Sequence, residues 1–228
     1  MFRRIAAALV LALLTARCAD HSTTAVELPL SGVQTPTAGS TPHFLRWAGS
    51  AAPTFKVSGL SGQVVNGASE AGPLSLDRYT VSFWAVRGES RSATIKYKDA
   101  SGGGNHPFLS LTITDPVTLP DGSTLAVGDS VLITINIDTT KIGVSLEPTG
   151  LQFGAPAQMQ MWYGGADGDL NGDGLVDATD SYVETQLLGM WWREGDVSDW
   201  QRIPATQAVS EKSFTVALPH FSQYAVSW

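Results

Sequence analysis

The sequence predicts an all-β protein, an antiparallel β-sandwich with one short helix in an acidic insertion. Three observations predict it. Apolar and polar residues alternate in many short runs, turn-forming residues separate these runs, and one acidic stretch leads into a segment with helical spacing. Alternation with a period of two is typical of strands with one buried face. Many such strands, joined by turns, favour a sandwich.

Five runs predict which side chains face the core. Turns such as SGGGN at 101–105 and LPDGS at 119–123 separate the runs. The side chains expected in the core are Tyr79, Val81, Phe83 and Ala85; Leu109, Leu111 and Ile113; Val131, Ile133, Ile135 and Ile137; Met159, Met161 and Tyr163; and Phe214, Val216 and Leu218. We therefore predict that residues 44–228 form the sandwich domain.

The first 43 residues have a different character. A basic start, MFRR, precedes a ten-residue apolar run, Ile5–Leu14. This run is too short to cross the ~30 Å hydrocarbon layer, so residues 1–17 are predicted to be an export signal. Residues 18–43 are rich in Ser, Thr and Pro, which is typical of a flexible tether.

Cys18 is the only cysteine of the chain, so no intramolecular disulfide can form. It stands where bacterial lipoprotein signals place their lipid-modified cysteine, and TARCAD resembles such a lipobox, except that Arg17 replaces the expected small residue. The sequence thus predicts lipidation of Cys18. The alternative is ordinary cleavage nearby.

The charge excludes one class of partner. The chain carries a net charge of -7, and three of its 14 basic residues lie in 1–17, which leaves 11 basic against 21 acidic residues, or -10, from Cys18 onward. Such a chain repels phosphate backbones, so we expect no nucleic-acid partner.

The acidic stretch DLNGDGLVDATD, Asp169 to Asp180, follows the spacing of an EF-hand calcium loop. Gly174 falls at the sharp turn, and Val176 is expected to pin the loop to the core. Hard oxygen ligands without nearby His or Cys favour Ca²⁺. The predicted ligands are Asp169, Asn171, Asp173, the backbone carbonyl of Leu175, Asp177 and Asp180. An acidic turn without metal is the alternative.

A short helix is predicted from Ala178 to Leu188. Val183, Leu187, Met190 and Trp191 have the spacing of one helix face, and Gly189 is expected to close the helix as a left-handed cap. The loop and helix together are predicted to form an insertion at about 164–198.

Two resemblances follow from these motifs. The single loop and its exiting helix resemble one repeat of a dockerin module, although dockerins carry two repeats. The order of LEPTGLQFGAPAQMQMWY (146–163), WQRI (200–203) and LPHFSQYAVSW (218–228) is similar to ZU-type domains of netrin receptors and zonula-occludens proteins. The second resemblance covers roughly 144–228 and implies an immunoglobulin-like or ZU-like sandwich.

Catalytic patterns are scarce. His21, His43, His106 and His220 lack metal-ligand spacing. The tripeptide HFS resembles the self-cleaving motif of some ZU-domain adaptors, which implies attack by the hydroxyl of Ser222 on the Phe221 carbonyl with His220 as base. Its alternative is a plain closing strand. The residues Tyr163, Trp191, Trp192 and Trp200 are expected in the core, with a sugar-stacking platform as the alternative.

The sequence therefore predicts a non-catalytic, exported cell-envelope protein with one structural calcium ion. It would be a lipoprotein of the outer membrane or cell surface, or otherwise periplasmic or secreted. Its partner would be an unnamed protein or glycan at the cell surface. The alternatives are a dockerin-like or carbohydrate-associated module and a domain that cleaves itself at Phe221–Ser222.

Overall fold

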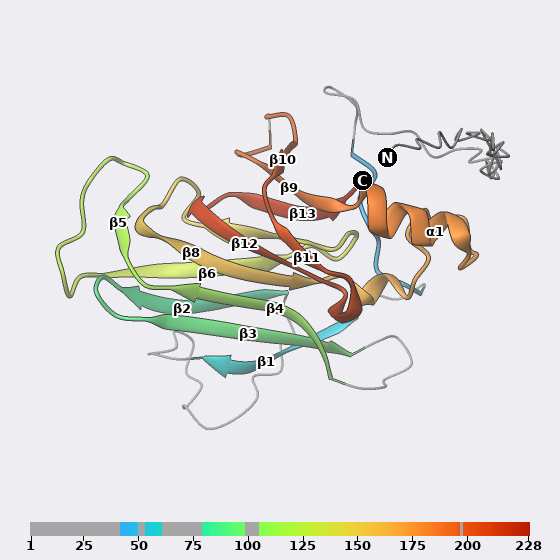
Figure 1. The fold of residues 1–228 in the computed structure, drawn as a ribbon. Coiled ribbons are helices and arrows are strands. Elements are labelled where there is room, and N and C mark those ends of the chain that lie inside the picture. The colour runs from blue at the N-terminus through green and yellow to red at the C-terminus, as the bar shows by residue number, and fades with distance from the viewer. Residues whose placement is uncertain (1–41, 50–52, 61–78, 99–104, 197) are drawn as a thin grey trace, which may run out of the picture. The chain divides into compact units, whose positions relative to one another are not determined.

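A computed structural model describes residues 42–49, 53–60, 79–98, 105–196 and 198–228. These residues form two antiparallel sheets, which confirms the predicted all-β sandwich (Figure 1). The first sheet has the order β1 (Thr54–Leu60), β3 (Arg91–Lys98), β4 (His106–Ile113), β8 (Gln152–Trp162), β12 (Ser213–His220) and β11 (Thr206–Ala208), with β5 (Pro116–Thr118) paired to β8. The second has the order β10 (Gln201–Ile203), β9 (Gly189–Arg193), β13 (Gln223–Ser227), β7 (Gly143–Glu147), β6 (Ser130–Ile137) and β2 (Thr80–Val86).

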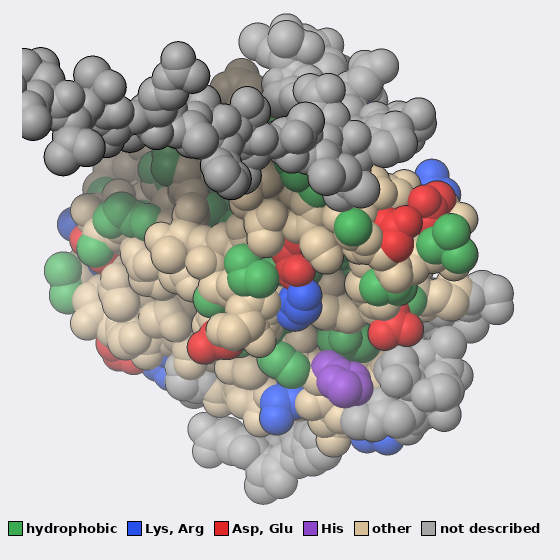
Figure 2. All heavy atoms as spheres, turned by 45° about the vertical axis from the view of Figure 1, so that its right-hand side comes forward, with side chains coloured by type: hydrophobic (Ala, Val, Ile, Leu, Met, Phe, Trp, Pro, Cys, Tyr) green, Lys and Arg blue, Asp and Glu red, His purple; other side chains and the backbone are tan. Residues whose placement is uncertain are grey.

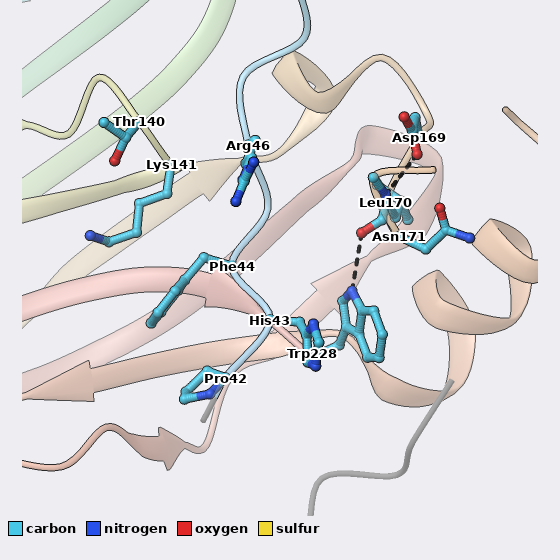
Figure 3. A pocket seen from close by; sticks show the side chains of 11 residues that line it. Pro42, His43, Phe44, Arg46, Thr140, Lys141, Asp169, Leu170, Asn171 and Trp228 are labelled. Atoms are coloured by element: carbon cyan, nitrogen blue, oxygen red, sulfur yellow. Dashed lines mark hydrogen bonds between the residues drawn. The ribbon is translucent and has the colours of Figure 1, made fainter. Parts of the chain in front are cut away.

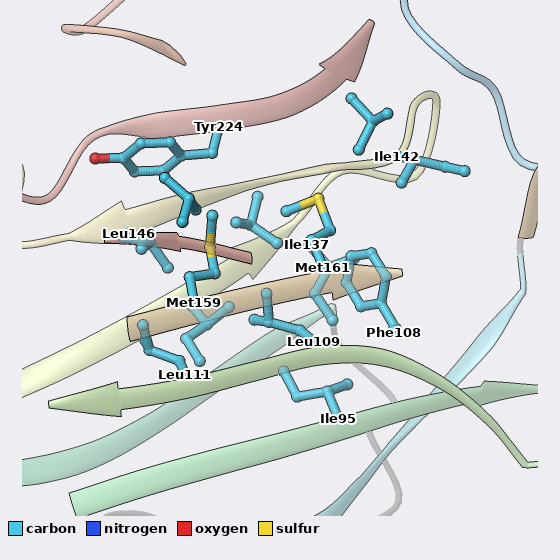
Figure 4. Packing of buried hydrophobic residues seen from close by; sticks show 14 of the residues in the cluster. Ile95, Phe108, Leu109, Leu111, Ile137, Ile142, Leu146, Met159, Met161 and Tyr224 are labelled. Carbon is cyan, nitrogen blue, oxygen red and sulfur yellow. The ribbon is translucent and has the colours of Figure 1, made fainter. Parts of the chain in front are cut away.

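In four of the five runs, all the side chains predicted to face the core are buried. In the first run Val81, Phe83 and Ala85 are buried, but Tyr79, just before β2, is 39% exposed at the rim. Figure 4 shows the two sheets contributing side chains to one core, with Met159 and Met161 from β8 beside Leu109 and Leu111 from β4. Burial of these apolar faces is the main driving force for the stacking of the sheets.

The described N-terminal segment closes one end of the sandwich. His43 and Trp228 exchange backbone hydrogen bonds, and Leu45 bonds to Val226 and Ile142. Burial alternates along this segment: Leu45 and Trp47 are buried, whereas Phe44 is half-buried and Arg46 is exposed. The sandwich thus includes His43, which the sequence pattern assigns to the tether.

The connection between β8 and β9 contains the predicted helix. It comprises a 3₁₀ turn, η1 (Gly164–Ala166), the acidic loop, helix α1 (Ala178–Tyr182) and a π-helical turn, η2 (Val183–Leu187). Val183 and Leu187 are buried as predicted.

The helical segment ends at Leu187, close to the predicted Leu188, but the prediction is wrong for the residues that follow it. Met190 and Trp191 belong to β9, which pairs with β13, so the connection ends at residue 188 and not 198. The backbone of Gly189 is not left-handed. A Cβ at this position would lie 2.5 Å from Nε of Arg202, so a larger residue would displace that guanidinium group.

A buried polar network holds the η2 turn against the first sheet. The Glu184 carboxylate accepts hydrogen bonds from the Tyr163 hydroxyl at 2.9 Å and from Nζ of Lys212 at 2.6 and 2.7 Å. Gln207 donates to the same hydroxyl and to the Glu184 carbonyl. Burial, together with the bond to Glu184, raises the pKa of Tyr163. This network fixes the position of the acidic loop that precedes it.

One face of the molecule is mixed in charge. Figure 2 shows acidic and basic side chains interspersed over the face turned to the viewer, with hydrophobic side chains scattered between them. Among the described residues, no helix is long and apolar enough to span a membrane.

Candidate functional site

The acidic loop is built around the carboxylate of Asp169. Its Oδ1 accepts hydrogen bonds from the backbone N–H groups of Gly172 and Asp173, and its Oδ2 accepts one from Gly174 at 2.9 Å. Gly172 and Gly174 have φ angles of +77° and +87°, a region that favours glycine. The sharp turn predicted at Gly174 is therefore present.

Asn171 and Asp173 continue the same pattern. The side-chain oxygen of Asn171 accepts from the N–H of Asp173 at 2.9 Å, and Asp173 accepts from the N–H of Leu175 at 2.8 Å. The Asn171 amide also donates to Oδ2 of Asp173. Such side-chain-to-backbone bonds turn the chain at successive residues.

Asp180 closes the loop from the first turn of α1. It is only 3% exposed, and its carboxylate accepts from the N–H groups of Leu170 (2.7 Å), Asn171 (3.2 Å) and Asp177 (2.9 Å). Asp177 is the helix N-cap and accepts from the N–H of Thr179. The two aspartates form a capping box, which joins the loop to the helix.

Leu170, not Val176, pins the loop to the sandwich. The prediction for Val176 is wrong, because its side chain is 69% exposed and its neighbour Leu175 is 63% exposed. Leu170 is buried, and its carbonyl accepts a hydrogen bond from Nε1 of the buried Trp228 at 3.0 Å. This anchor comes from the far end of the chain, so the loop sequence alone does not reveal it.

The predicted ligands fit calcium by chemistry. They offer only oxygen atoms, which Ca²⁺ prefers. A carboxylate has about four acceptor positions, of which Asp169 and Asp180 each use three for backbone N–H groups. Among the described residues, no three His, Cys, Asp or Glu side chains form a group that could hold a metal ion. A bound ion would therefore use acceptor positions that remain after the backbone bonds are made.

His220 is the last residue of β12, and Phe221 and Ser222 connect it to β13 in the other sheet. Ser222 is fully buried, and its hydroxyl donates to the backbone carbonyl of Arg193. The His220 ring packs edge-on against Trp192, with centroids 5.0 Å apart. Tyr224 donates to the His220 carbonyl at 2.6 Å. The serine hydroxyl is thus turned to a structural acceptor and not to His220.

We predict that the chain does not cleave itself at Phe221–Ser222. The bond from Ser222 to Arg193 leaves the hydroxyl without a base, so prolonged incubation should yield intact protein. Intact-mass spectrometry checks this, with Ser222→Ala as the control. Loss of the seven residues 222–228 from the wild type but not from the variant would contradict it.

The predicted aromatic residues do not form one platform. Tyr163 and Trp191 are buried, as expected for core residues, while Trp192 and Trp200 are half-buried. Trp200 instead packs edge-on against Phe44, with centroids 4.9 Å apart.

Cys18 and His21 lie outside the described residues.

Comparisons with known proteins give no further guide. No family model, curated protein or solved structure matches this chain. The ZU-like and dockerin-like resemblances stay predictions, and the site must be interpreted from its own geometry.

Proposed function

We propose that this protein is a non-catalytic, exported binding domain whose 169–180 loop holds one structural calcium ion. The supporting observation is the direction of the loop's amides. Backbone N–H groups from seven residues of the loop point to the carboxylates of Asp169, Asp173 and Asp180. These bonds lower the cost of gathering negative charge, and they orient the side chains before any ion arrives.

The ion would add stability to a loop that the backbone already shapes. Asp169, Asn171, Asp173, Asp177, Asp180 and the Leu175 carbonyl would supply its ligands. Extracellular calcium is plentiful, so a dissociation constant of roughly 10⁻⁴–10⁻³ M would suffice, as in other extracellular modules. At a hundredfold excess over that constant, binding would stabilise the fold by about 2.7 kcal/mol.

Calorimetry and thermal melting test this proposal. We expect heat of calcium binding in the wild type and a rise in melting temperature, and we expect Asp173→Ala to abolish both. Asp121→Ala is the matched control, because Asp121 makes the same kind of turn, with Ser123, outside the loop. If the wild type shows no heat and the same melting curve in chelator, the stretch is only an acidic turn.

The proposed location rests on Cys18. If this residue carries a lipid, the wild-type protein expressed in a bacterium should partition into detergent, and Cys18→Ser should move it to the soluble fraction. The lipid chain on Cys18 would hold the protein in the membrane, and the variant has no cysteine to carry it. A wild type that is already soluble would contradict lipidation and leave a periplasmic or secreted domain.

A further inference from the structure

A cavity of about 330 Å³ lies at one end of the first sheet. The antiparallel order brings the end of β3, the start of β4, the end of β8 and the residues before β12 together there, and the N-terminal segment around Trp47 adds a further wall. The volume is near the lower limit of the roughly 300–1,000 Å³ that is usual for small-molecule sites. The cavity is therefore suited to a small group.

Aromatic rings form much of the cavity wall. Trp47 and Tyr97 are buried, with ring centroids 5.3 Å apart, and the ring of His106 lies at the same centroid distance from Tyr97. Trp162 is half-buried and follows Met161, whose side chain is in the core, so the Trp162 ring lies on the solvent side of β8. The faces of such rings attract cations.

The backbone acceptors beside Trp47 are already engaged. The backbone of Gly165 approaches the indole so closely that a Cβ there would lie 2.5 Å from it. The carbonyl of Gly165 accepts a hydrogen bond from the N–H of Ala48 at 2.8 Å, and that of Gly164 accepts one from Asp167 at 3.1 Å. A group that enters the cavity here meets rings and CH groups, and a hydrogen-bond donor gains little.

The exposed rim of the cavity is negative. Asp167 and Glu211 line it, and both are exposed. The Glu211 carboxylate accepts a hydrogen bond from the amide of Gln160, at the long distance of 3.5 Å. Lys212 also lines the cavity, but its ammonium group is neutralised by Glu184, at 2.6 Å. Three carboxylates therefore surround one ammonium group, which favours a positively charged ligand.

Asp167 keeps a side chain at a position that favours glycine. Its φ angle is +52°, and among the described residues other than glycine only Lys212, at +53°, shares a positive φ. The Lys212 side chain is bound to Glu184. The Asp167 carboxylate makes no hydrogen bond or ion pair with any residue that the structure describes. It is therefore available to a ligand.

The cavity beside the acidic loop differs in this respect. It is larger, at about 620 Å³, and Phe44, Lys141 and Asp169 are among the residues that line it (Figure 3). There Asp169 accepts hydrogen bonds from the loop backbone, and Lys141 is paired with Asp138, 2.6 Å from its Nζ. Of these two cavities, the smaller one combines several aromatic rings with a carboxylate that has no partner among the described residues.

We propose that this smaller cavity binds a methylated ammonium group, of the kind that choline carries. The cation would lie against the aromatic rings, and the carboxylates of Asp167 and Glu211 would balance its charge. A primary ammonium group suits the cavity less well, because it is strongly hydrated and its three N–H groups need acceptors. The site goes beyond the proposed calcium site and does not depend on it.

Titration calorimetry with choline tests the proposal, in chelator and at about pH 8, where ordinary imidazole side chains are uncharged. Two comparison ligands each change one property. In the uncharged carbon analogue a tert-butyl group replaces the trimethylammonium group, and ethanolamine carries a primary ammonium group instead. We expect the wild type to bind choline at least about tenfold more tightly than either of them.

Two variants separate the ring from the charge. Trp162→Leu should weaken choline binding by about tenfold, because leucine keeps an apolar contact but has no ring face. Asp167→Asn should weaken it several-fold, because asparagine tolerates the same backbone conformation without the charge. Trp84→Leu is the control, since it removes a half-buried tryptophan from β2 in the second sheet and should leave binding unchanged. Melting temperatures close to that of the wild type would show that the variants are folded.

Three outcomes would overturn the proposal: no heat of choline binding in the wild type, equal binding of the uncharged analogue, or full binding by Trp162→Leu. Equal binding of ethanolamine would overturn the choice of a methylated group. If Trp162→Leu does not fold, full binding by Asp167→Asn overturns the proposal in its place. The titrations are made without calcium, so a failure of the calcium site leaves their result unchanged.

Discussion

Asp180→Ala should unfold the 169–180 loop whether or not calcium is present, and should lower the free energy of unfolding by about 2–4 kcal/mol. The reason is the number of donors that depend on this buried carboxylate. Three backbone N–H groups, of Leu170, Asn171 and Asp177, would lose their acceptor, and one of them belongs to the helix cap. Urea unfolding in chelator measures the loss.

Asp173→Ala is the matched comparison. Asp173 is exposed and accepts only one backbone N–H group, from Leu175, besides the amide of Asn171. In chelator we expect it to cost less than about 1 kcal/mol. In calcium it should lose the whole gain that the ion gives the wild type. Equal losses for the two variants in chelator would contradict the structural role assigned to Asp180.

Much of the fold could be predicted because a strand with one buried face shows a regular alternation of apolar and polar residues in the sequence. In β6, Val131, Ile133 and Ile135 are buried while the residues between them are partly exposed, so the alternation is visible in the sequence. β9 carries no such contrast. Gly189, Met190 and Trp191 are all buried, and Met190 and Trp191 also have the spacing that continues a helix from Val183. Local spacing alone therefore assigns Met190 and Trp191 to the face of the helix that ends just before them.

The acidic loop, too, could be predicted only in part. Its internal turns depend on Asp, Asn and Gly residues two to five positions apart, and these interactions can be predicted from local spacing. Its attachment depends on Trp228, 58 residues from Leu170, and on Lys212, 28 residues from Glu184. A local sequence pattern cannot predict contacts between residues so far apart in the chain. The cavity of about 620 Å³ beside the loop cannot be predicted locally for the same reason, because residues 42–46, 140–141, 169–172 and Trp228 together line it.

An aromatic cluster links the N-terminal segment, residues 42–49, to the core. Trp47 packs against Phe55, Tyr97 and Phe108, with ring centroids 5.2, 5.3 and 5.0 Å apart. On its other side the backbone of Gly165 approaches so closely that a Cβ there would lie 2.5 Å from the indole. Trp47 is thus held between the first sheet and the segment that leads to the acidic loop. It belongs to the same short segment as Phe44 and Arg46, whose positions depend on it.

Phe108→Ala should therefore destabilise the whole domain by about 3–5 kcal/mol and loosen the segment that carries Arg46. Phe108 is fully buried on β4, and its removal leaves a cavity under Trp47 that the two sheets cannot close. Urea unfolding followed by tryptophan fluorescence measures the loss. Tyr79→Ala is the control, because Tyr79 contacts Phe55 at the exposed rim of the same cluster, with centroids 5.7 Å apart. It should cost much less. If both variants lose the same free energy, the cluster does not anchor the N-terminal segment, and that segment must be held by the backbone bonds of His43 and Leu45 alone.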